Sequence, residues 1–173
     1  MTDAIATHPP VRELDPTRLG DHVDRLYRAA VGLCGSPVDA EDLVQETFVQ
    51  VLRKPRLLRA DDDIGYLLRV LRNTFYSSYR SEARRPRTAE LAEHEELPEQ
   101  RPGAAPDAIV ATREVLDAVA DLPEPYREAI AAVDLAGLSY KEAARALGTR
   151  EGTIMSRVHR GRGQVADMLG YTS

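Results

Sequence analysis

A short basic stretch near the end of the 173-residue chain carries the side chains best suited to binding a polyanion. Between Arg150 and Arg162 there are four arginines and one glutamate, a local charge of +3 in a chain whose net charge is −5. Guanidinium groups bind phosphates through paired N–H donors, and a basic segment within an acidic chain is typical of nucleic-acid binding. The stretch therefore predicts contacts with nucleic acid.

Two short helices must position these arginines. In LSYKEAARALG, Ser139 and Glu142 have the spacing of a capping box, and Gly148 predicts the end of the first helix. Thr149 is expected to cap a second helix with apolar residues on one side and polar or cationic ones, including Ser156 and Arg160, on the other. Such a pair suits insertion in a DNA major groove, although helical proteins of other functions also contain amphipathic pairs.

A second basic segment lies in the N-terminal half of the chain. From residue 64 to residue 87 there are six arginines and one glutamate, a local charge of +5, with tyrosines between them. Cations beside exposed aromatic rings favour the binding of single-stranded DNA, because cations bind its phosphates and unpaired bases stack on the rings. The alternative is that the tyrosines only border the core. The 100° rotation per residue predicts that the outward face of this helix carries Tyr66, Arg69, Asn73, Tyr76, Ser77 and Arg80.

The periodicity indicates an all-α protein of two small helical domains. Residues 88–107 contain three prolines and six acidic residues against one arginine, which predicts a flexible acidic linker. We expect a flexible N-terminal arm over 1–14, one helical domain over 15–87 and a helix-turn-helix domain over 108–170. Asp15 and Pro16 are expected to begin the first helix and Gly35 to end it.

Composition excludes several other classes of protein. No apolar run approaches the ~20 residues that span a bilayer, and the N-terminus lacks the pattern of a signal peptide, so we expect a cytoplasmic protein without membrane insertion. The single Cys34 is most simply a small apolar residue near a helix end, and a reactive thiol is the less favoured alternative. The histidines show no metal-ligand spacing, so neither a metal nor a cofactor is expected.

Three segments resemble one family. GTIMSRVHRGR, the preceding LSYKEAARALG, and DAEDLVQETF near residue 40 resemble the extracytoplasmic-function (ECF) sigma factors of bacterial RNA polymerase. This resemblance implies a promoter-specificity subunit without enzymatic activity that binds core RNA polymerase (β′ clamp and β subunit), promoter DNA and an anti-sigma factor. It also implies that the β′ clamp helices are contacted by Asp42, Gln45 and Glu46.

The same resemblance assigns promoter contacts. It implies that the domain over 15–87 is sigma2-like and that it melts and recognises the −10 element. The implied contacts with this element are Tyr66, Arg69, Asn73, Tyr76, Ser77, Arg80 and Arg84. It implies likewise that the domain over 108–170 is sigma4-like and recognises the −35 element. The implied contacts there are Thr153, Met155, Ser156, Arg157, His159 and Arg160. Met155 stands where the family usually has a cation, and Gly161 and Gly163 are expected to loosen the helix.

Two other functions fit parts of the sequence. One is a stand-alone helix-turn-helix regulator, which would bind duplex DNA tightly without polymerase. The other is a helical metal-dependent hydrolase that uses Asp42 and Glu46, although two carboxylates four residues apart on one helix are a weak metal signature.

Overall fold

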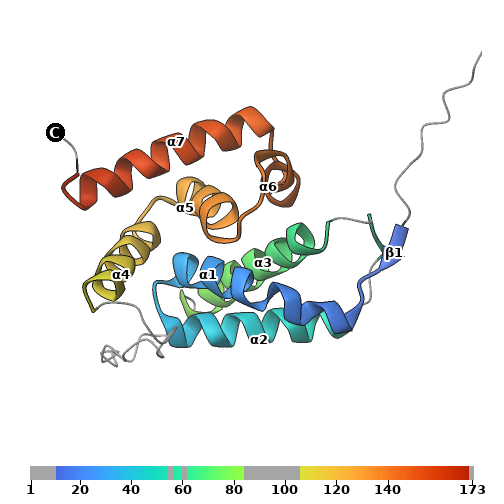
Figure 1. Cartoon of the computed structure of the whole chain (residues 1–173). Helices are drawn as coiled ribbons and strands as arrows, with labels where there is room; N and C mark the ends of the chain where they lie inside the picture. The colour runs from blue at the N-terminus through green and yellow to red at the C-terminus, as the bar shows by residue number, and fades with distance from the viewer. Residues whose placement is uncertain (1–10, 54–56, 60–61, 84–105, 172–173) are drawn as a thin grey trace, which may run out of the picture.

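Helices make up nearly all of the chain that the structure describes. A computed structural model describes residues 11–53, 57–59, 62–83 and 106–171 (Figure 1). In chain order the elements are β1 (Val11–Glu13), the 3-10 helix η1 (Pro16–His22), α1 (Val23–Cys34), α2 (Pro37–Arg53), β2 (Leu57–Arg59), α3 (Asp63–Ala83), α4 (Pro106–Ala120), α5 (Glu124–Ile130), the π-helical turn η2 (Ala131–Leu135), α6 (Tyr140–Leu147) and α7 (Glu151–Met168).

The N-terminal domain is built from η1, α1, α2 and α3. Asp15 begins it, and its side chain accepts a hydrogen bond from the Thr17 backbone N–H at 2.9 Å, which confirms the predicted cap. The first seven residues of the predicted helix form η1, and α1 begins only at Val23. Gly35 ends α1 with a φ of 70°, which costs a glycine no steric strain. Leu26, Leu67 and Leu71 are fully buried between these helices.

A short strand replaces part of the expected N-terminal arm. Val11–Glu13 pairs antiparallel with Leu57–Arg59, with Arg12 opposite Leu58. Leu58 is buried, so the ladder also contributes to the core. The prediction of a flexible arm was therefore wrong for residues 11–13; residues 1–10 lie outside the described residues. The ladder ties the N-terminal segment to the connection that leads into α3.

The C-terminal domain consists of α4, α5, η2, α6 and α7. It begins at Pro106, two residues before the predicted boundary, and most of the predicted linker lies outside the described residues. Val119, Ile154 and Val158 are its most deeply buried large side chains. The predicted helix over LPEPYREAIAAVDL starts as α5 and widens into η2. The helix-turn-helix is formed by α6 and α7, as predicted.

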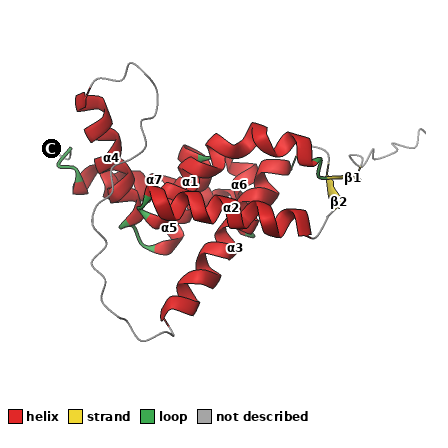
Figure 2. Ribbon diagram, turned by 90° about the horizontal axis from the view of Figure 1, so that it is seen from below, coloured by secondary structure: helices red, strands yellow, loops and turns green. Residues whose placement is uncertain are grey.

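The two domains pack directly against each other. In Figure 1, α5, α6 and α7 lie above α1, α2 and α3, and in the view from below in Figure 2 these helices overlap. One continuous hydrophobic core contains side chains of both domains, including Leu33 of α1 and Leu122 after α4. The approach is close at Gly32, where an added Cβ would lie 2.3 Å from Cδ1 of Leu135. This contact between α1 and η2 was not predicted from the sequence.

Candidate nucleic-acid and polymerase interfaces

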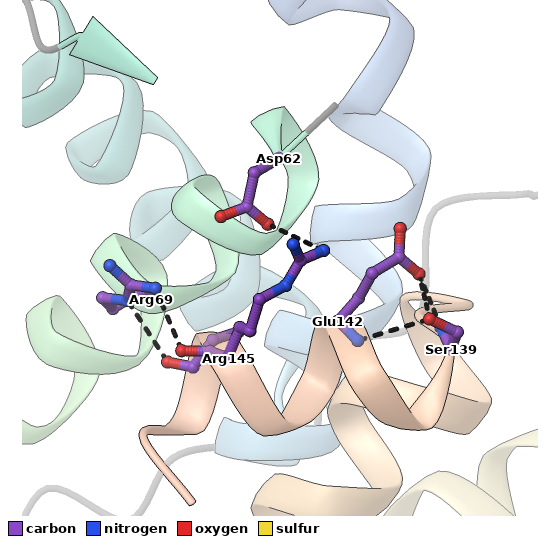
Figure 3. Close-up of polar contacts among 6 residues, drawn as sticks. Asp62, Arg69, Ser139, Glu142 and Arg145 are labelled. Carbon is purple, nitrogen blue, oxygen red and sulfur yellow. Dashed lines mark hydrogen bonds and ion pairs between the residues drawn. The ribbon is translucent and has the colours of Figure 1, made fainter. Parts of the chain in front are cut away.

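The start of α6 is fixed by the predicted capping box. The Glu142 backbone N–H donates to Ser139 Oγ at 3.3 Å, and the Ser139 backbone N–H donates to Glu142 Oε2 at 2.8 Å (Figure 3). The hydrogen bonds from Ser139 lower the pKa of the Glu142 carboxyl. Gly148 ends the helix in the left-handed region, with φ 64°. Both ends of the first helix of the helix-turn-helix are therefore set by residues close to them in the sequence.

The cap of α7 differs from the prediction. Arg150, rather than Thr149, occupies the N-cap position, and it makes no side-chain capping hydrogen bond. The Thr149 backbone N–H instead donates to the Ala144 carbonyl at 2.9 Å, which closes the end of α6. The prediction of a Thr149 cap was wrong because the turn uses this residue to end the first helix.

Most of the side chains predicted for the −35 element lie on the exposed face of α7. Thr153 and Arg157 are half-buried at its edge, and the exposed positions are Met155, Ser156, His159 and Arg160. Met155 is 51% exposed, so its apolar side chain is accessible to a binding partner. An open groove runs between this face and the start of α5, lined by Pro123, Pro125, Tyr126, Gly152, Thr153, Ser156, Arg157 and Arg160.

The last arginine of the basic stretch has a partner within the protein. Arg162 donates from Nε and Nη2 to the Asp134 carboxylate, at 3.0 and 2.6 Å. This bidentate pair raises the pKa of Arg162 and ties α7 to η2. Arg162 thus binds within the protein, whereas Arg150, Arg157 and Arg160 face outward or lie at the edge of α7. Sequence analysis missed this role because the two residues lie 28 positions apart.

The two glycines that were expected to loosen α7 differ in surroundings. Gly161 is buried, and an added Cβ would lie 2.9 Å from Cγ1 of Ile130 in α5. Gly163 is exposed and has open space at the same position. Gly161 therefore permits the close packing of α7 on α5, whereas Gly163, the other of the two, has no packing reason.

Alanine substitutions are expected to distinguish the packed Gly161 from the unpacked Gly163. Gly163→Ala should stabilise the protein by up to about 1 kcal/mol, because alanine is the better helix former and nothing obstructs its Cβ. Gly161→Ala should give no such stabilisation or should destabilise the protein, since the Ile130 side chain must shift to make room for the added Cβ. Urea unfolding of both variants beside the wild type measures the difference. Equal stabilisation by both changes would contradict the packing role of Gly161.

Tyr66 does not face outward. Its side chain is 8% exposed and belongs to the hydrophobic core, so the predicted orientation of Tyr66 was wrong. The outward orientation was predicted from the 100° rotation per residue relative to the apolar stripe of α3 alone. In the fold, α6 also contacts this part of α3. An added Cβ at the neighbouring Gly65 would lie 3.9 Å from the Ala146 Cβ. Tyr66 is therefore part of the core that the two domains share, on a helix that α6 contacts at the neighbouring Gly65.

Arg69, on the same side of α3, contacts α6 as well. It is exposed, yet it donates from Nε to the Ala146 carbonyl at 3.3 Å and from Nη2 to the Arg145 carbonyl at 3.0 Å (Figure 3). Arg145 in turn points to Asp62 at the start of α3, with 3.9 Å between Nη2 and Oδ1. One of the predicted −10 contacts is thus engaged by the other domain.

The remaining predicted −10 residues follow along α3. Asn73 and Ser77 are exposed, as predicted, whereas Tyr76 is half-buried, and burial raises its pKa to about 12. Arg72 lies over the Tyr76 ring, 5.4 Å from its centroid, and forms an ion pair with Glu128 of α5. The Arg80 side chain and Arg84 lie outside the described residues.

The outward face of α2 presents the predicted polymerase contacts. Asp42, Gln45 and Glu46 are all exposed. Apolar side chains that sequence analysis did not single out lie among them: Val38, Val49 and Leu52 are 47%, 39% and 53% exposed. Val38, Asp42, Gln45, Val49 and Leu52 follow a spacing of four and three residues, which is the spacing of helices that pack against other helices. We call these five residues with Glu46 the α2 stripe.

Cys34 has the surroundings of an inert thiol. It is partly buried, Sγ donates to the Ala30 carbonyl at 2.7 Å, and burial raises its pKa to about 12. At neutral pH it is therefore protonated and a poor nucleophile. Within the described ranges no group of three or more His, Cys, Asp and Glu side chains is arranged to hold a metal ion. In the same ranges no helix has the length and apolar character to cross a membrane.

Comparisons with known proteins identify the family. The family models for Sigma-70 region 2 and Sigma-70 region 4 match residues 19–85 and 112–165. The ECF RNA polymerase sigma factor SigE of Mycolicibacterium smegmatis is 38% identical over 156 residues, which are 88% of this chain and 60% of that protein. EcfG of Rhodopseudomonas palustris, another ECF sigma factor, is 34% identical over 148 residues, 85% of this chain and 80% of that protein.

Solved structures agree with this result. The sigma factor RpoE from Bartonella quintana, in complex with the anti-sigma factor NepR, has a TM-score of 0.69 and 28% identity over 91% of this chain and 97% of that one. CnrH, in complex with the cytosolic domain of CnrY, shares the fold with a TM-score of 0.59 at 24% identity, over 91% of this chain and 88% of that one. The chain belongs to the sigma-70 family and, within it, to the ECF RNA polymerase sigma factors.

Proposed function

We propose that the protein binds core RNA polymerase in the cytoplasm and directs initiation at promoters whose −35 and −10 elements it recognises, with no catalytic site of its own. The observation that carries this proposal is the face of α7: exposed polar and cationic side chains on a helix held by α6, by Arg162 and by Gly161. The matches to Sigma-70 regions 2 and 4 support the same function. The β and β′ subunits of the polymerase are the proposed docking partners.

The α2 stripe supports the polymerase part of the proposal. A row of exposed valines and a leucine with polar residues between them is costly to leave in water, and its spacing suits a helical partner. We assign this partner as the clamp helices of the β′ subunit, and Asp42, Gln45 and Glu46 as its polar contacts. Val49 and Leu52 extend the contact towards the end of α2.

Transcription with purified components tests the proposal. Core polymerase, this protein and a library of promoter fragments should yield defined transcripts, and none should form without the protein. A stand-alone regulator would instead bind duplex DNA tightly and fail to co-purify with core polymerase. Bound divalent metal in elemental analysis would favour the hydrolase. Absence of transcripts at every promoter, together with no polymerase binding, would overturn the assignment.

An anti-sigma factor is a further proposed partner. Support comes from the solved structures of RpoE with NepR and of CnrH with the cytosolic domain of CnrY, which share the two-domain fold. We propose that such a partner binds this chain while its domains are packed together. Co-purification from native cells tests this: a second protein that dissociates when polymerase is added supports it, and polymerase without such a protein contradicts it.

Met155 is expected to contact a thymine methyl group in the −35 element. Its side chain is exposed in the middle of the DNA-facing surface, and helical side chains lean towards the preceding turn, where Gly152 leaves open space. Apolar contact with the thymine C5-methyl is one of the base-specific contacts of the major groove. Burial of one such group stabilises by about 0.8 kcal/mol, or about fourfold in affinity.

Deoxyuridine substitution measures this contact, because it removes only the methyl group. Replacing the thymines of the −35 element one at a time should weaken wild-type binding about fourfold at one position. The matched variant Met155→Ala should not distinguish thymine from uracil there. Equal sensitivity of wild type and Met155→Ala at every position would contradict the assignment.

A further inference from the structure

We propose that the free protein holds itself in a closed state, in which arginines of the N-terminal domain bind the C-terminal domain and mask part of the DNA-melting face of α3 while the −35 face of α7 stays free. We call Arg25, Arg28, Arg69 and Arg72 the arginine lock. The inference rests on the proposed function for the assignment of α3 to the −10 element. It concerns the state of the protein before any partner binds.

Two arginines of α1 bind the end of η2. Arg25 donates from Nε to the Ala136 carbonyl at 2.6 Å and from Nη2 to the Gly137 carbonyl at 2.9 Å. Arg28 donates from Nε to the Leu135 carbonyl at 3.1 Å. The last carbonyls of a helix carry a partial negative charge and have no partner within the helix. The N-terminal domain therefore supplies the C-terminal hydrogen-bond partners of η2.

The same arrangement recurs between α3 and α6. Arg69 donates to the carbonyls of Arg145 and Ala146 at the end of α6 (Figure 3). Arg72, one turn further along α3, forms an ion pair with Glu128, which is 6% exposed. A carboxylate this buried depends on its partner, since an unpaired buried charge is strongly unfavourable. Both arginines lie on the helix assigned to promoter melting, so the lock occupies groups that DNA phosphates would bind.

Apolar contacts close the same interface. Tyr66 is buried within the core cluster that the two domains share, so no base can stack on its ring. Gly32 allows α1 to approach Leu135 and Val119 of the C-terminal domain closely. A side chain at position 32 would push these elements apart, so the glycine makes the closed packing possible.

The masking is one-sided. Met155, Ser156, His159 and Arg160 remain exposed in the closed state, and so do the polar residues of the α2 stripe. Figure 1 shows α2 and α7 on opposite sides of the molecule, with the interface between them. Polymerase can therefore dock on α2 before the lock opens, and single-stranded DNA can engage Tyr66, Arg69 and Arg72 only afterwards. The lock delays the melting step and leaves the first contacts available.

Charge reversal at Glu128 is the test, because this residue contributes to the lock and belongs to neither DNA-binding face. Glu128→Lys places a cation against Arg72 and should open the interface. The affinity of the free protein for fluorescent single-stranded oligodeoxythymidine should rise about tenfold, within the range usual for coupled sites. Glu114→Lys, an equal charge change at an exposed position of α4, controls for added positive charge and should give a much smaller rise.

Domain separation is measured in parallel. Dyes on Glu41→Cys in α2 and Lys141→Cys in α6, both exposed positions, should show high energy transfer in the wild type and lower transfer with Glu128→Lys. The high pKa of Cys34 keeps it from competing for the label. If Glu128→Lys does not fold by circular dichroism, Glu128→Gln and Arg25→Gln serve instead, with a smaller opening expected.

The arginine lock is overturned if the folded Glu128 variant shows the energy transfer of the wild type and binds single-stranded DNA no more tightly than Glu114→Lys does. The proposed function fails by a different result, namely no transcription with core polymerase by the wild type. The transfer measurement needs no polymerase, so the two failures are distinguishable.

Discussion

Glu46→Lys is expected to reduce transcription by at least about thirtyfold while leaving the fold intact. The side chain is exposed on α2, where it accepts a hydrogen bond from Gln50 Nε2 at 3.1 Å, so its reversal removes a surface hydrogen bond but no core contact. Truncating or reversing one partner of a desolvated charged contact at an interface costs about 2–5 kcal/mol, which corresponds to about thirtyfold or more in affinity. Titration of core polymerase with labelled variants gives this number directly.

Gln45→Ala tests the same surface without a change of charge and should cost less than Glu46→Lys. Asp121→Lys, at an exposed position outside α2, is the matched control for charge reversal and should behave like the wild type. Thermal unfolding of all three variants checks that the fold is kept. If Gln45→Ala and Glu46→Lys both bind core polymerase as the wild type does, the α2 stripe is not the docking surface.

Arg160→Ala is expected to weaken promoter binding by about 1–3 kcal/mol and to relax the base preference at one or two −35 positions. Arg160 is exposed on the outward face of α7, from where a guanidinium can reach the O6 and N7 atoms of guanine. Met155 contributes no cation and Arg162 is bound to Asp134, so base-specific hydrogen bonding depends strongly on Arg160. A panel of single-base promoter changes measures the loss of preference.

Arg157→Ala provides the comparison. Arg157 is half-buried at the edge of the face, where it is placed to meet phosphate. Its removal should weaken binding evenly across promoters and reduce the slope of log affinity against log salt by about one. If Arg160→Ala lowers affinity equally on every promoter, Arg160 is a phosphate contact and the orientation of α7 in the groove is different.

Local signals were sufficient to predict most of the α-helices and several of their ends. The cap at Asp15, the capping box of Ser139 and Glu142, and the helix ends at Gly35 and Gly148 all depend on residues within a few positions of one another. Such contacts are the same in a short peptide and in the folded chain. The exposed positions of Asp42, Gln45 and Glu46, and most of those on α7, follow from helical periodicity in the same way.

Contacts between distant segments could not be predicted from the sequence. Tyr66 was placed outward because α3 was considered without α6, and the partners of Arg69 and Arg162 lie 76 and 28 positions away or more. The 3-10 geometry of η1 and the strand pairing of Val11–Glu13 likewise depend on where the neighbouring segments pack. An amphipathic pattern indicates which face of a helix is buried, but it does not indicate a second element that covers the opposite face.

The arginine lock depends mostly on main-chain acceptors, which side-chain mutations do not remove. Arg25, Arg28 and Arg69 bind main-chain carbonyls, which every residue provides, so most side-chain substitutions in η2 and at the end of α6 leave these hydrogen bonds possible. The C-terminal domain is then free to alter its base preference without a compensating change in the N-terminal domain. We expect weak sequence covariation between the domains, concentrated at the side-chain pair of Arg72 and Glu128.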